Sequence, residues 1–352
     1  MSATRVDPPR ETAREQSAPS STARAARYLM VVRELGVLAV LLLLILITYA
    51  TNSRFLSEQS VRDLLLGAAI LVILAVGQTL VIVTRNVDLS VGSLVGLIAF
   101  GTGKLLLEYP GAPIIVAILA GMLAGAFFGA LNGALVALAK VPALVITLGT
   151  LYIYRSIDHL WASGQQINAA DMPAGFLDFG RSAGILGIPW LAWIALIVVA
   201  VATFYMRSYR SGRELYAIGS DPDAARLSGI PSGRRVFGVF AINGALAGLA
   251  GVLYAARYGT LDATVGTGLE LEVVAAAVIG GVAIFGGSGT VYGAALGALL
   301  LTTIDSALPV LRVDAFWQQA FVGALILAAI GFDRLLSVRL ARRMKSRRTH
   351  VV

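Results

Sequence analysis

The sequence contains no cysteine and only two histidines, His159 and His350. Without thiols the chain has no disulfide framework, no thiolate metal site and no cysteine nucleophile, and two such distant histidines do not indicate a zinc or haem centre. Charged residues are also scarce, at 14% of 352 residues, whereas hydrophobic residues make up 57%. Because a soluble domain has about 25% charged residues, a lipid bilayer must solvate much of this chain.

Signatures of ATP-binding and zinc enzymes are missing as well. No Gly-x-x-x-x-Gly-Lys-Ser/Thr phosphate loop occurs, and the cluster Gly286-Gly287-Ser288-Gly289 is not followed by lysine. The zinc-protease pattern His-Glu-x-x-His is absent too. We therefore expect a protein that is not itself an enzyme and that has no cofactor.

Long apolar segments dominate what is present. A spanning helix needs about 20 largely apolar residues, and candidate segments lie at 29–50, 61–84, 89–106, 113–139, 142–162, 189–206, 235–256, 271–286, 289–307 and 316–332. The sequence thus predicts an all-α membrane protein with about ten transmembrane helices in a domain at 28–335. Residues 1–27 are polar and lack an apolar period, so we expect a disordered cytoplasmic tail there, and residues 336–352 are expected to form a basic cytoplasmic tail.

The basic residues indicate an orientation. If the N-terminus is cytoplasmic and the spans alternate, most lysines and arginines fall into cytoplasmic segments, the largest of which is the loop 207–235. This is the bias that inner segments of membrane proteins show. It predicts an even number of spans in a bacterial plasma membrane, with both termini in the cytoplasm.

Two patterns repeat along the chain. Asp88-Leu89-Ser90-Val91-Gly92-Ser93 is echoed by Asp262-Ala263-Thr264-Val265-Gly266-Thr267, and glycines at 121, 125 and 129 are echoed by glycines at 289, 293 and 297. If spans 2–5 repeat as spans 7–10, the halves start an odd number of spans apart and are inverted. Transporters often use inverted repeats, with the pathway near their interface. Each glycine trio is expected to place a small-residue stripe on a helix face for close packing.

Polar residues within the apolar segments are candidates for the solute pathway. Ionisable groups at membrane depth are costly, so they mark function or capping. Asp88 either lines a broken helix or caps the next helix by accepting from the amides of Ser90 and Val91. The amides of Asn132 and Asn243 either join helices or contact a hydroxylated solute. The candidate pathway residues are Asp88, Ser90, Asn132, Asn243, Glu272 and Asp305.

The loop 207–235 contains a short helix signal. Asp221 suits an N-cap, Pro222 suits the first helical position, and Gly229 suits the stop. These predict a helix of about two turns outside the membrane. Such a rigid element either docks a partner or is an ordinary surface helix.

This loop resembles the cytoplasmic coupling segment of permeases of ABC importers of the ribose/xylose/rhamnose type. The resemblance covers about residues 30–335 in order and includes Asp88–Ser93, Val145–Thr150 and the run from Gly266 through Glu272 to Gly289. Thr84-Arg85-Asn86 and the stretch Thr303–Arg312 most resemble the autoinducer-2 and rhamnose permeases. Many family members have Gly-Gly where this chain has Arg85-Asn86.

The resemblance implies a permease subunit of an ATP-driven importer for a monosaccharide or sugar-like solute, of the rhamnose, autoinducer-2, ribose or xylose class. It implies an ATP-binding subunit, a second permease and an extracytoplasmic sugar-binding protein as partners, besides membrane lipid, and no nucleic acid. ATP-driven closure would move the 221–229 helix. The coupling positions it implies are Gly212, Glu214, Asp221, Pro222, Ala225, Arg226, Leu227 and Gly229.

Two other transporter classes stay open. An ion-gradient-driven secondary transporter also uses inverted repeats, but it should carry paired acidic residues at mid-membrane. Glu272 and Asp305 alone give little support for this class. A permease for branched-chain amino acids shares the fold plan, but the Asp-Leu-Ser-Val-Gly-Ser run favours a sugar.

Overall fold

The computed structural model describes residues 21–139 and 141–314, and a few single positions between 317 and 331. In this part of the chain the regular elements are helices, with two isolated β-bridges. The elements are α1 (Ser21–Thr51), η1 (Ser53–Leu56), α2 (Glu58–Val83), α3 (Val91–Glu108), α4 (Ile114–Ala139), α5 (Ala143–Ala162), η2 (Ala169–Asp171), α6 (Ala174–Arg181), η3 (Ile185–Gly187), α7 (Trp190–Ser208), α8 (Arg210–Ser220), α9 (Pro222–Leu227), α10 (Ser232–Tyr258), α11 (Leu269–Ile279) and α12 (Val291–Val310). The predicted all-α membrane fold is confirmed.

Seven of the described helices are long and apolar enough to cross a membrane: α1 from Glu34 onward, α2, α3, α4, α7, α10 and α12. Each coincides with a predicted span. The segment 142–162 also forms a helix, α5, but this helix carries Arg155 and Asp158 and is not among the seven. The predicted span 316–332 lies largely outside the described residues.

The prediction of a continuous span at 271–286 is wrong. The helix there, α11, has 11 residues, so it is about 16 Å long, roughly half the apolar thickness of a bilayer. Helix α11 ends with the C-cap Gly280, and the chain continues to α12 through a turn that backbone hydrogen bonds between Ala283 and Ser288 and between Gly286 and Ala283 close. Val282 and Ala283, which follow Gly281, are apolar and packed inside the protein, whereas Phe285 is exposed.

The N-terminal boundary also differs from the prediction. Helix α1 begins at Ser21, within the segment 1–27 that the sequence assigned to a disordered tail. The remainder of that tail and the basic segment 336–352 lie outside the described residues.

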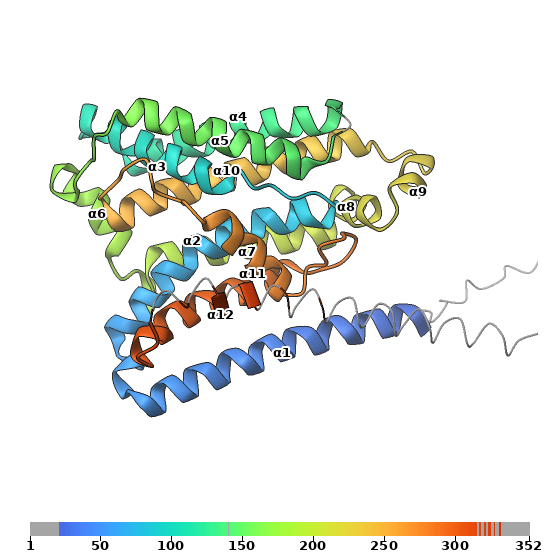
Figure 1. Ribbon diagram of the computed structural model, residues 1–352, viewed down its shortest axis with the longest axis horizontal. Helices are drawn as coiled ribbons and strands as arrows, with labels where there is room; N and C mark the ends of the chain where they lie inside the picture. The colour runs from blue at the N-terminus through green and yellow to red at the C-terminus, as the bar shows by residue number, and fades with distance from the viewer. Residues whose placement is uncertain are drawn as a thin grey trace, which may run out of the picture.

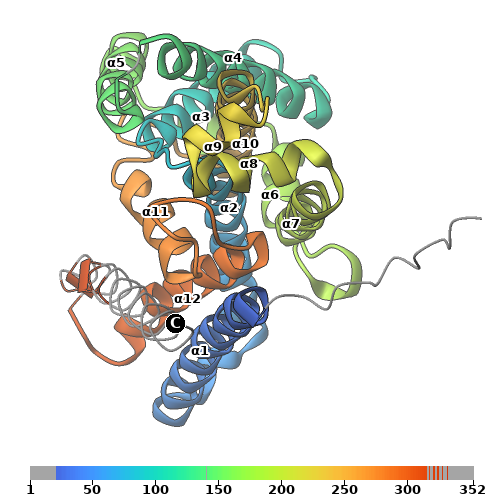
Figure 2. The same ribbon diagram turned by 90° about the vertical axis from the view of Figure 1, so that its right-hand side faces the viewer.

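Within the described residues, the helices of the two halves have an inverted arrangement. Helix α10 packs against α4, α3 and α2. Helix α2 packs against α12, α11 and α10. In the contacts of α2, α12 therefore takes the place of α4, and α11 takes the place of α3. Figure 1 shows α2 and α10 running in opposite directions, as do α3 and α11. Seen from the α8–α9 end, α2 and α10 lie between α3–α5 on one side and α11, α12 and α1 on the other (Figure 2).

Glycines allow the closest helix contacts in both halves. A Cβ atom on Gly125 of α4 would overlap the carbonyl oxygen of Gly244 in α10, and one on Gly293 of α12 would overlap that of Gly280. Small residues therefore bring the backbones together, as predicted. The prediction that Gly289 shares a helical stripe is wrong, because this residue precedes α12 in a turn with φ 133°.

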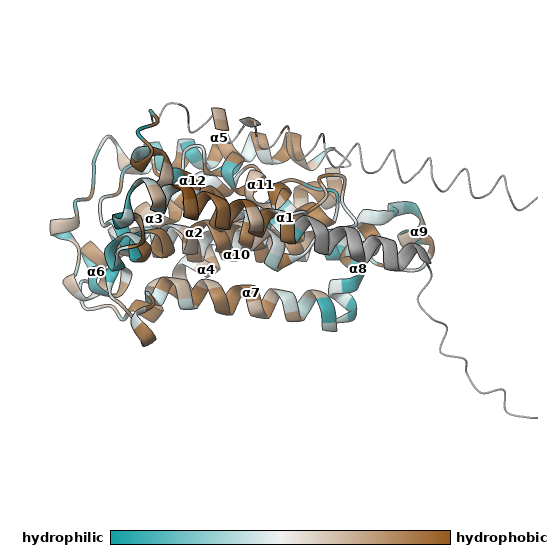
Figure 3. Ribbon diagram, turned by 90° about the horizontal axis from the view of Figure 1, so that it is seen from below, coloured by the Kyte–Doolittle hydropathy of each residue, from teal (hydrophilic) through white to brown (hydrophobic). Residues whose placement is uncertain are grey.

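Polar segments gather at the two ends of the molecule. Figure 3 shows an apolar middle, with hydrophilic residues around α8 and α9 at one end and around α6 at the other. The N-terminal end of α1 lies at the α8–α9 end (Figure 1). This polarity is the one that a bilayer imposes on a protein that spans it.

Candidate functional site

The residues between α2 and α3 form a turn that its own side chains close. Oδ1 of Asp88 accepts from the amide of Ser90 at 2.9 Å and from the hydroxyl of Ser90 at 2.7 Å. The hydroxyl of Ser93 donates to the carbonyl of Ser90 at 2.8 Å. Such Asx turns give the backbone partners where the helical bonds stop. Asp88 takes the amide of Ser90, one of the two amides that the capping alternative named, and its other bond is to Asn243 rather than to the amide of Val91.

Side chains from α10 and α4 bind this turn, and a side chain from α5 binds one of them. From α10, Nδ2 of Asn243 donates to Oδ2 of Asp88 at 2.9 Å. From α4, Nδ2 of Asn132 donates to Oγ of Ser90 at 2.8 Å, and from α5 the Tyr154 hydroxyl donates to Oδ1 of Asn132 at 3.0 Å. These five residues, at most 3% exposed, are called the inner network below. Four predicted pathway residues thus come together in one buried cluster.

The sequence analysis missed the contribution of α5. Thr147 accepts from the amide of Leu89 at 3.1 Å and donates to the carbonyl of Val87 at 3.1 Å, so α5 holds the turn in addition to Tyr154. The polar residues Thr147, Thr150, Tyr154 and Asp158 are buried at helical spacing. This polar stripe was the signal that could have identified α5 as part of the site.

Some buried polar atoms beside the inner network lack partners. Both amide atoms of Gln78 in α2 and Oδ1 of Asn243 have no hydrogen-bond partner among the described residues. Gly77 packs directly against the side chain of Asn243. A buried amide without a partner costs about 1–3 kcal/mol, so this region has hydrogen-bonding capacity left for water or a polar solute.

Glu272 and Asp305 lie apart from the inner network. They line a cavity of about 280 Å³ between α2, α10, α11 and α12, together with Asp63, Gly67, Ile70, Leu71, Tyr254, Arg257, Tyr258, Leu269, Thr302 and Ser306. The cavity combines carboxylates, hydroxyls and an arginine, a set that can hydrogen-bond a hydroxylated solute. The six predicted pathway residues therefore divide into two places.

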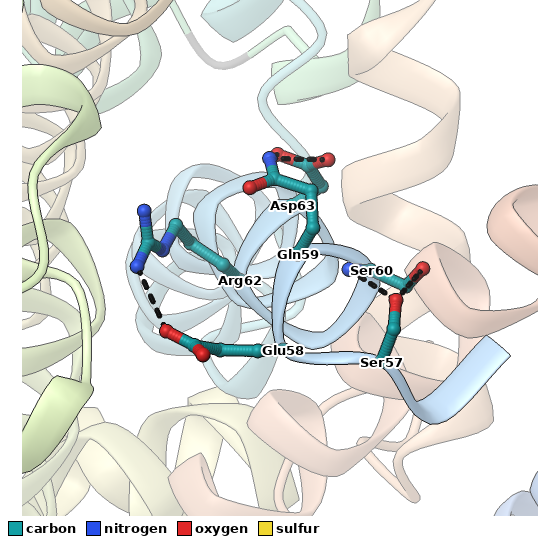
Figure 4. Close-up of polar contacts among 6 residues, drawn as sticks. All are labelled: Ser57, Glu58, Gln59, Ser60, Arg62 and Asp63. Carbon is teal, nitrogen blue, oxygen red and sulfur yellow. Dashed lines mark hydrogen bonds and ion pairs between the residues drawn. The ribbon is translucent and has the colours of Figure 1, made fainter. Parts of the chain in front are cut away.

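Four residues of α2 form one wall of this cavity, namely Asp63, Gly67, Ile70 and Leu71. Figure 4 shows Gln59 beside Asp63 and Arg62 beside Glu58, on different sides of the helix. Nε2 of Gln59 is 3.1 Å from each carboxylate oxygen of Asp63, and Arg257 of α10 donates to the Asp63 carbonyl at 3.2 Å. The Asp63 carboxylate is thus oriented from within its own helix.

The segment before α11 repeats the turn before α3. Oδ1 of Asp262 accepts from the amide and the hydroxyl of Thr264 at 2.7 and 2.6 Å, and the Thr267 hydroxyl donates to the Thr264 carbonyl at 2.7 Å. The bonds from Thr264 hold the pKa of the Asp262 carboxyl below its ordinary value. Arg155 of α5 fixes this turn by donating to the carbonyls of Ala263 and Val265.

The short helix α9 has the predicted signals. Oδ1 of Asp221 accepts from the amides of Asp223 and Ala224 at 3.1 and 3.0 Å, and Pro222 occupies the first turn. Gly229 ends the segment with φ 75°. Leu227 is 89% exposed, although it lies on a polar end of the molecule, so it presents an apolar side chain that the described residues leave uncovered.

Helix α8 anchors α9 to the membrane helices. Glu214 binds Arg210 at 2.9 Å and Arg235 of α10 at 2.6 Å, and the hydrogen bond from Arg235 contributes most to lowering the pKa of its carboxyl. A Cβ atom on Gly212 would overlap the Tyr205 carbonyl. Glu214, Gly212 and the buried Ala225 therefore hold the segment, while Arg226 and Leu227 project from it.

Comparison with known proteins adds the family. Residues 60–330 match the family described as branched-chain amino acid transport system / permease component. The chain is 37% identical to the autoinducer 2 import system permease protein LsrC of Escherichia coli (strain K12 / DH10B), over 89% of this chain and 90% of that protein. The protein of the same name from Shigella flexneri is 38% identical over 89% and 90%. No solved structure matches.

Proposed function

Because this chain belongs to the family of ABC-importer permeases, we propose that it forms the transmembrane pathway for a sugar-like solute of the autoinducer-2 and rhamnose class. The observation that carries the proposal is the length of the similarity, which extends over 313 residues. The family description alone fits branched-chain amino acids too, and the role of the relatives in autoinducer 2 import favours the sugar-like solute.

The proposed partners follow from the two ends of the molecule. An ATP-binding subunit docks on α9 in the cytoplasm, where the exposed Leu227 and Arg226 meet it. An extracytoplasmic sugar-binding protein delivers the solute at the opposite end, and a second permease completes the pathway. This assignment places both termini in the cytoplasm, since the inner end carries the larger share of arginines, in a bacterial inner membrane.

The proposed mechanism uses the two polar places in turn. The solute first meets the outer cavity that Glu272 and Asp305 line. When the ATP-binding subunits close, α9 moves, and the halves of the permease rearrange so that the inner network opens to the pathway. The partnerless atoms of Gln78 and Asn243 then gain hydrogen bonds from water or solute. The chain needs no cofactor, since the partner subunit hydrolyses ATP.

Transport by the reconstituted complex tests this function. The permease, its ATP-binding subunit and its binding protein are placed in liposomes, and uptake of labelled rhamnose and autoinducer-2 is measured with ionophores that collapse ion gradients. Ribose and xylose serve as competitors. We expect uptake that requires ATP and persists without a gradient, whereas uptake that needs only an ion gradient would contradict the proposal.

Variants of α9 test the docking role. Leu227→Glu and Arg226→Ala should uncouple ATP hydrolysis from uptake without blocking membrane insertion, because both side chains project from the segment. Asp223→Ala is a matched control, since it removes only an exposed ion pair, which is worth about 0–1 kcal/mol, and it should transport normally. Full uptake by the Leu227 and Arg226 variants would refute docking at α9.

A further inference from the structure

Three segments of backbone meet where α8 ends. The amide of Gly287 donates to the carbonyl of Val83, the last residue of α2, at 2.9 Å. A Cβ atom on Gly219 of α8 would overlap that same carbonyl, and one on Gly287 would lie close to the backbone of Ser220. The end of α8 is therefore wedged between the turn after α2 and the turn before α12, one from each inverted half.

Arg85 ties this junction together. Its Nε donates to the carbonyl of Gly219 at 2.5 Å and its Nη2 donates to the carbonyl of Ser220 at 2.7 Å. Carbonyls in the last turn of a helix lack intrahelical partners, and a cation is favourable there. The planar guanidinium suits this task because it binds two neighbouring acceptors at once.

The backbone at Arg85 points to a role for its side chain. Arg85 follows the C-cap Thr84 of α2 and has φ 65°, the left-handed conformation that glycine adopts without cost. An arginine here is unfavourable for α2 alone. The contacts that compensate for this lie in α8, more than 130 residues away in the sequence.

The position of Arg85 links the two functional regions. On one side, Ser220 is followed directly by Asp221, the N-cap of α9. On the other side, Arg85 lies in the same short segment as Asp88, which Asn243 and Ser90 hold in the inner network. Arg85 therefore connects the end of α8, next to α9, with the short segment that carries Asp88.

We propose that Arg85 is a positioning residue that transmits the movement of α9 to the segment 84–90 and so to the start of α3. The proposal rests on the proposed function. It goes beyond docking, because it names the contact that converts docking into a change at the pathway.

The test compares two arginines that each donate two hydrogen bonds to carbonyls at the end of a helix. Arg85→Gly removes the guanidinium and relieves the left-handed backbone. Arg181→Ala is the matched control, because Arg181 donates from Nε and Nη2 to the carbonyls of Arg257 and Tyr258 in the last turn of α10, at the other end of the molecule. Rhamnose and autoinducer-2 uptake per ATP hydrolysed is measured in liposomes with the partner subunits, alongside thermal unfolding.

The proposal predicts a specific loss of coupling. Arg85→Gly should lower the solute transported per ATP about tenfold, the factor that corresponds to about 1.4 kcal/mol, while its melting temperature stays at or above the wild-type value. Arg85→Lys keeps the charge but loses the planar guanidinium, so its ratio of solute transported to ATP hydrolysed should lie between those of the wild type and Arg85→Gly. Arg181→Ala should keep the wild-type ratio.

Each outcome is decisive. A wild-type ratio in Arg85→Gly overturns the proposal. If that variant does not insert, Arg85→Lys decides by the same criterion, and an equal loss in Arg181→Ala would show a merely structural effect and overturn it too. Failure of the proposed function is distinct, because the wild-type complex would then show no ATP-dependent uptake.

Discussion

The turn before α3 and the turn before α11 have the same internal hydrogen bonds and different surroundings. In each, an aspartate accepts from the amide and hydroxyl two residues later, and a second hydroxyl closes the turn. Asp88 is 1% exposed, whereas Thr264 and Thr267 of the other turn are exposed. The local sequence therefore determines the turn, and the tertiary environment determines what the turn does.

Adjacent residues of α5 serve the two turns. Tyr154 belongs to the inner network, while Arg155 donates to the carbonyls of the turn before α11. The turns also touch, since a Cβ atom on Gly92 would overlap the Gly266 carbonyl and one on Gly266 would overlap that of Gly92. These are equivalent positions of the repeated pattern, so the two halves meet at their equivalent points.

Adding a methyl group at the contact between Gly92 and Gly266 should have the largest effect on stability. Gly266→Ala adds a methyl group against Gly92 at φ 77°, and we expect a loss of about 2–5 kcal/mol, from left-handed strain and overpacking together. Gly268→Ala is the control, because Gly268 has φ 88° and open space around its Cβ position. It should lose only about 1–2 kcal/mol. Equal losses in thermal unfolding would show that the turns do not press on each other.

Replacing the aspartate of each turn with asparagine should have the second-largest effect, and the effect should differ between the two turns. Asp88→Asn replaces one of the two carboxylate oxygens that accept from Ser90 and Asn243 with a donor, and the lost acceptor in a buried site should cost about 1–3 kcal/mol. Transport should fall more than expression. Asp262→Asn, on the more exposed turn, should change stability by about 0.5 kcal/mol or less.

Uptake per milligram of inserted protein measures the difference between these two variants. A similar loss of transport and expression in Asp88→Asn would indicate that the residue only caps the turn. Similar transport by both variants would remove the functional distinction between the turns.

Tyr154→Phe should have a smaller effect. It removes the hydroxyl that donates to Asn132 and should destabilise the protein by about 1 kcal/mol. Tyr152→Phe on the same helix is the control, since Tyr152 is 65% exposed and should tolerate the change. If the unfolding temperatures of both variants shift equally, the hydrogen bond from Tyr154 to Asn132 does not stabilise the protein.

The smallest effect is expected at Glu214, which lies outside both turns. Arg235 and Arg210 lower its pKa from the ordinary 4.5, so its ion pairs stabilise the folded state above that pH and lose their effect as the pH falls through the lowered value. Glu214→Gln should therefore flatten this part of the acid dependence of unfolding, measured from neutral pH to below 4.5. An unchanged acid dependence would contradict the assignment.

Apolar length predicted most of the fold because long apolar helices have few alternatives in a bilayer. It failed at α11, since buried turns are as apolar as a helix and only Gly280-Gly281 marked the break. The polar residues of the site were identified singly. Their partnership was not predictable, because contacts such as Asn243 to Asp88 join residues 155 positions apart and depend on how the two halves pack.

The most direct test of the proposed membrane orientation uses the absence of cysteine in this chain. Single cysteines at Thr264 and Leu227, both exposed in the structure, are labelled in intact cells and in inside-out vesicles with a maleimide that does not cross membranes. The account predicts labelling of position 264 in intact cells and of position 227 only in inside-out vesicles. Labelling of both positions from the same side would contradict it.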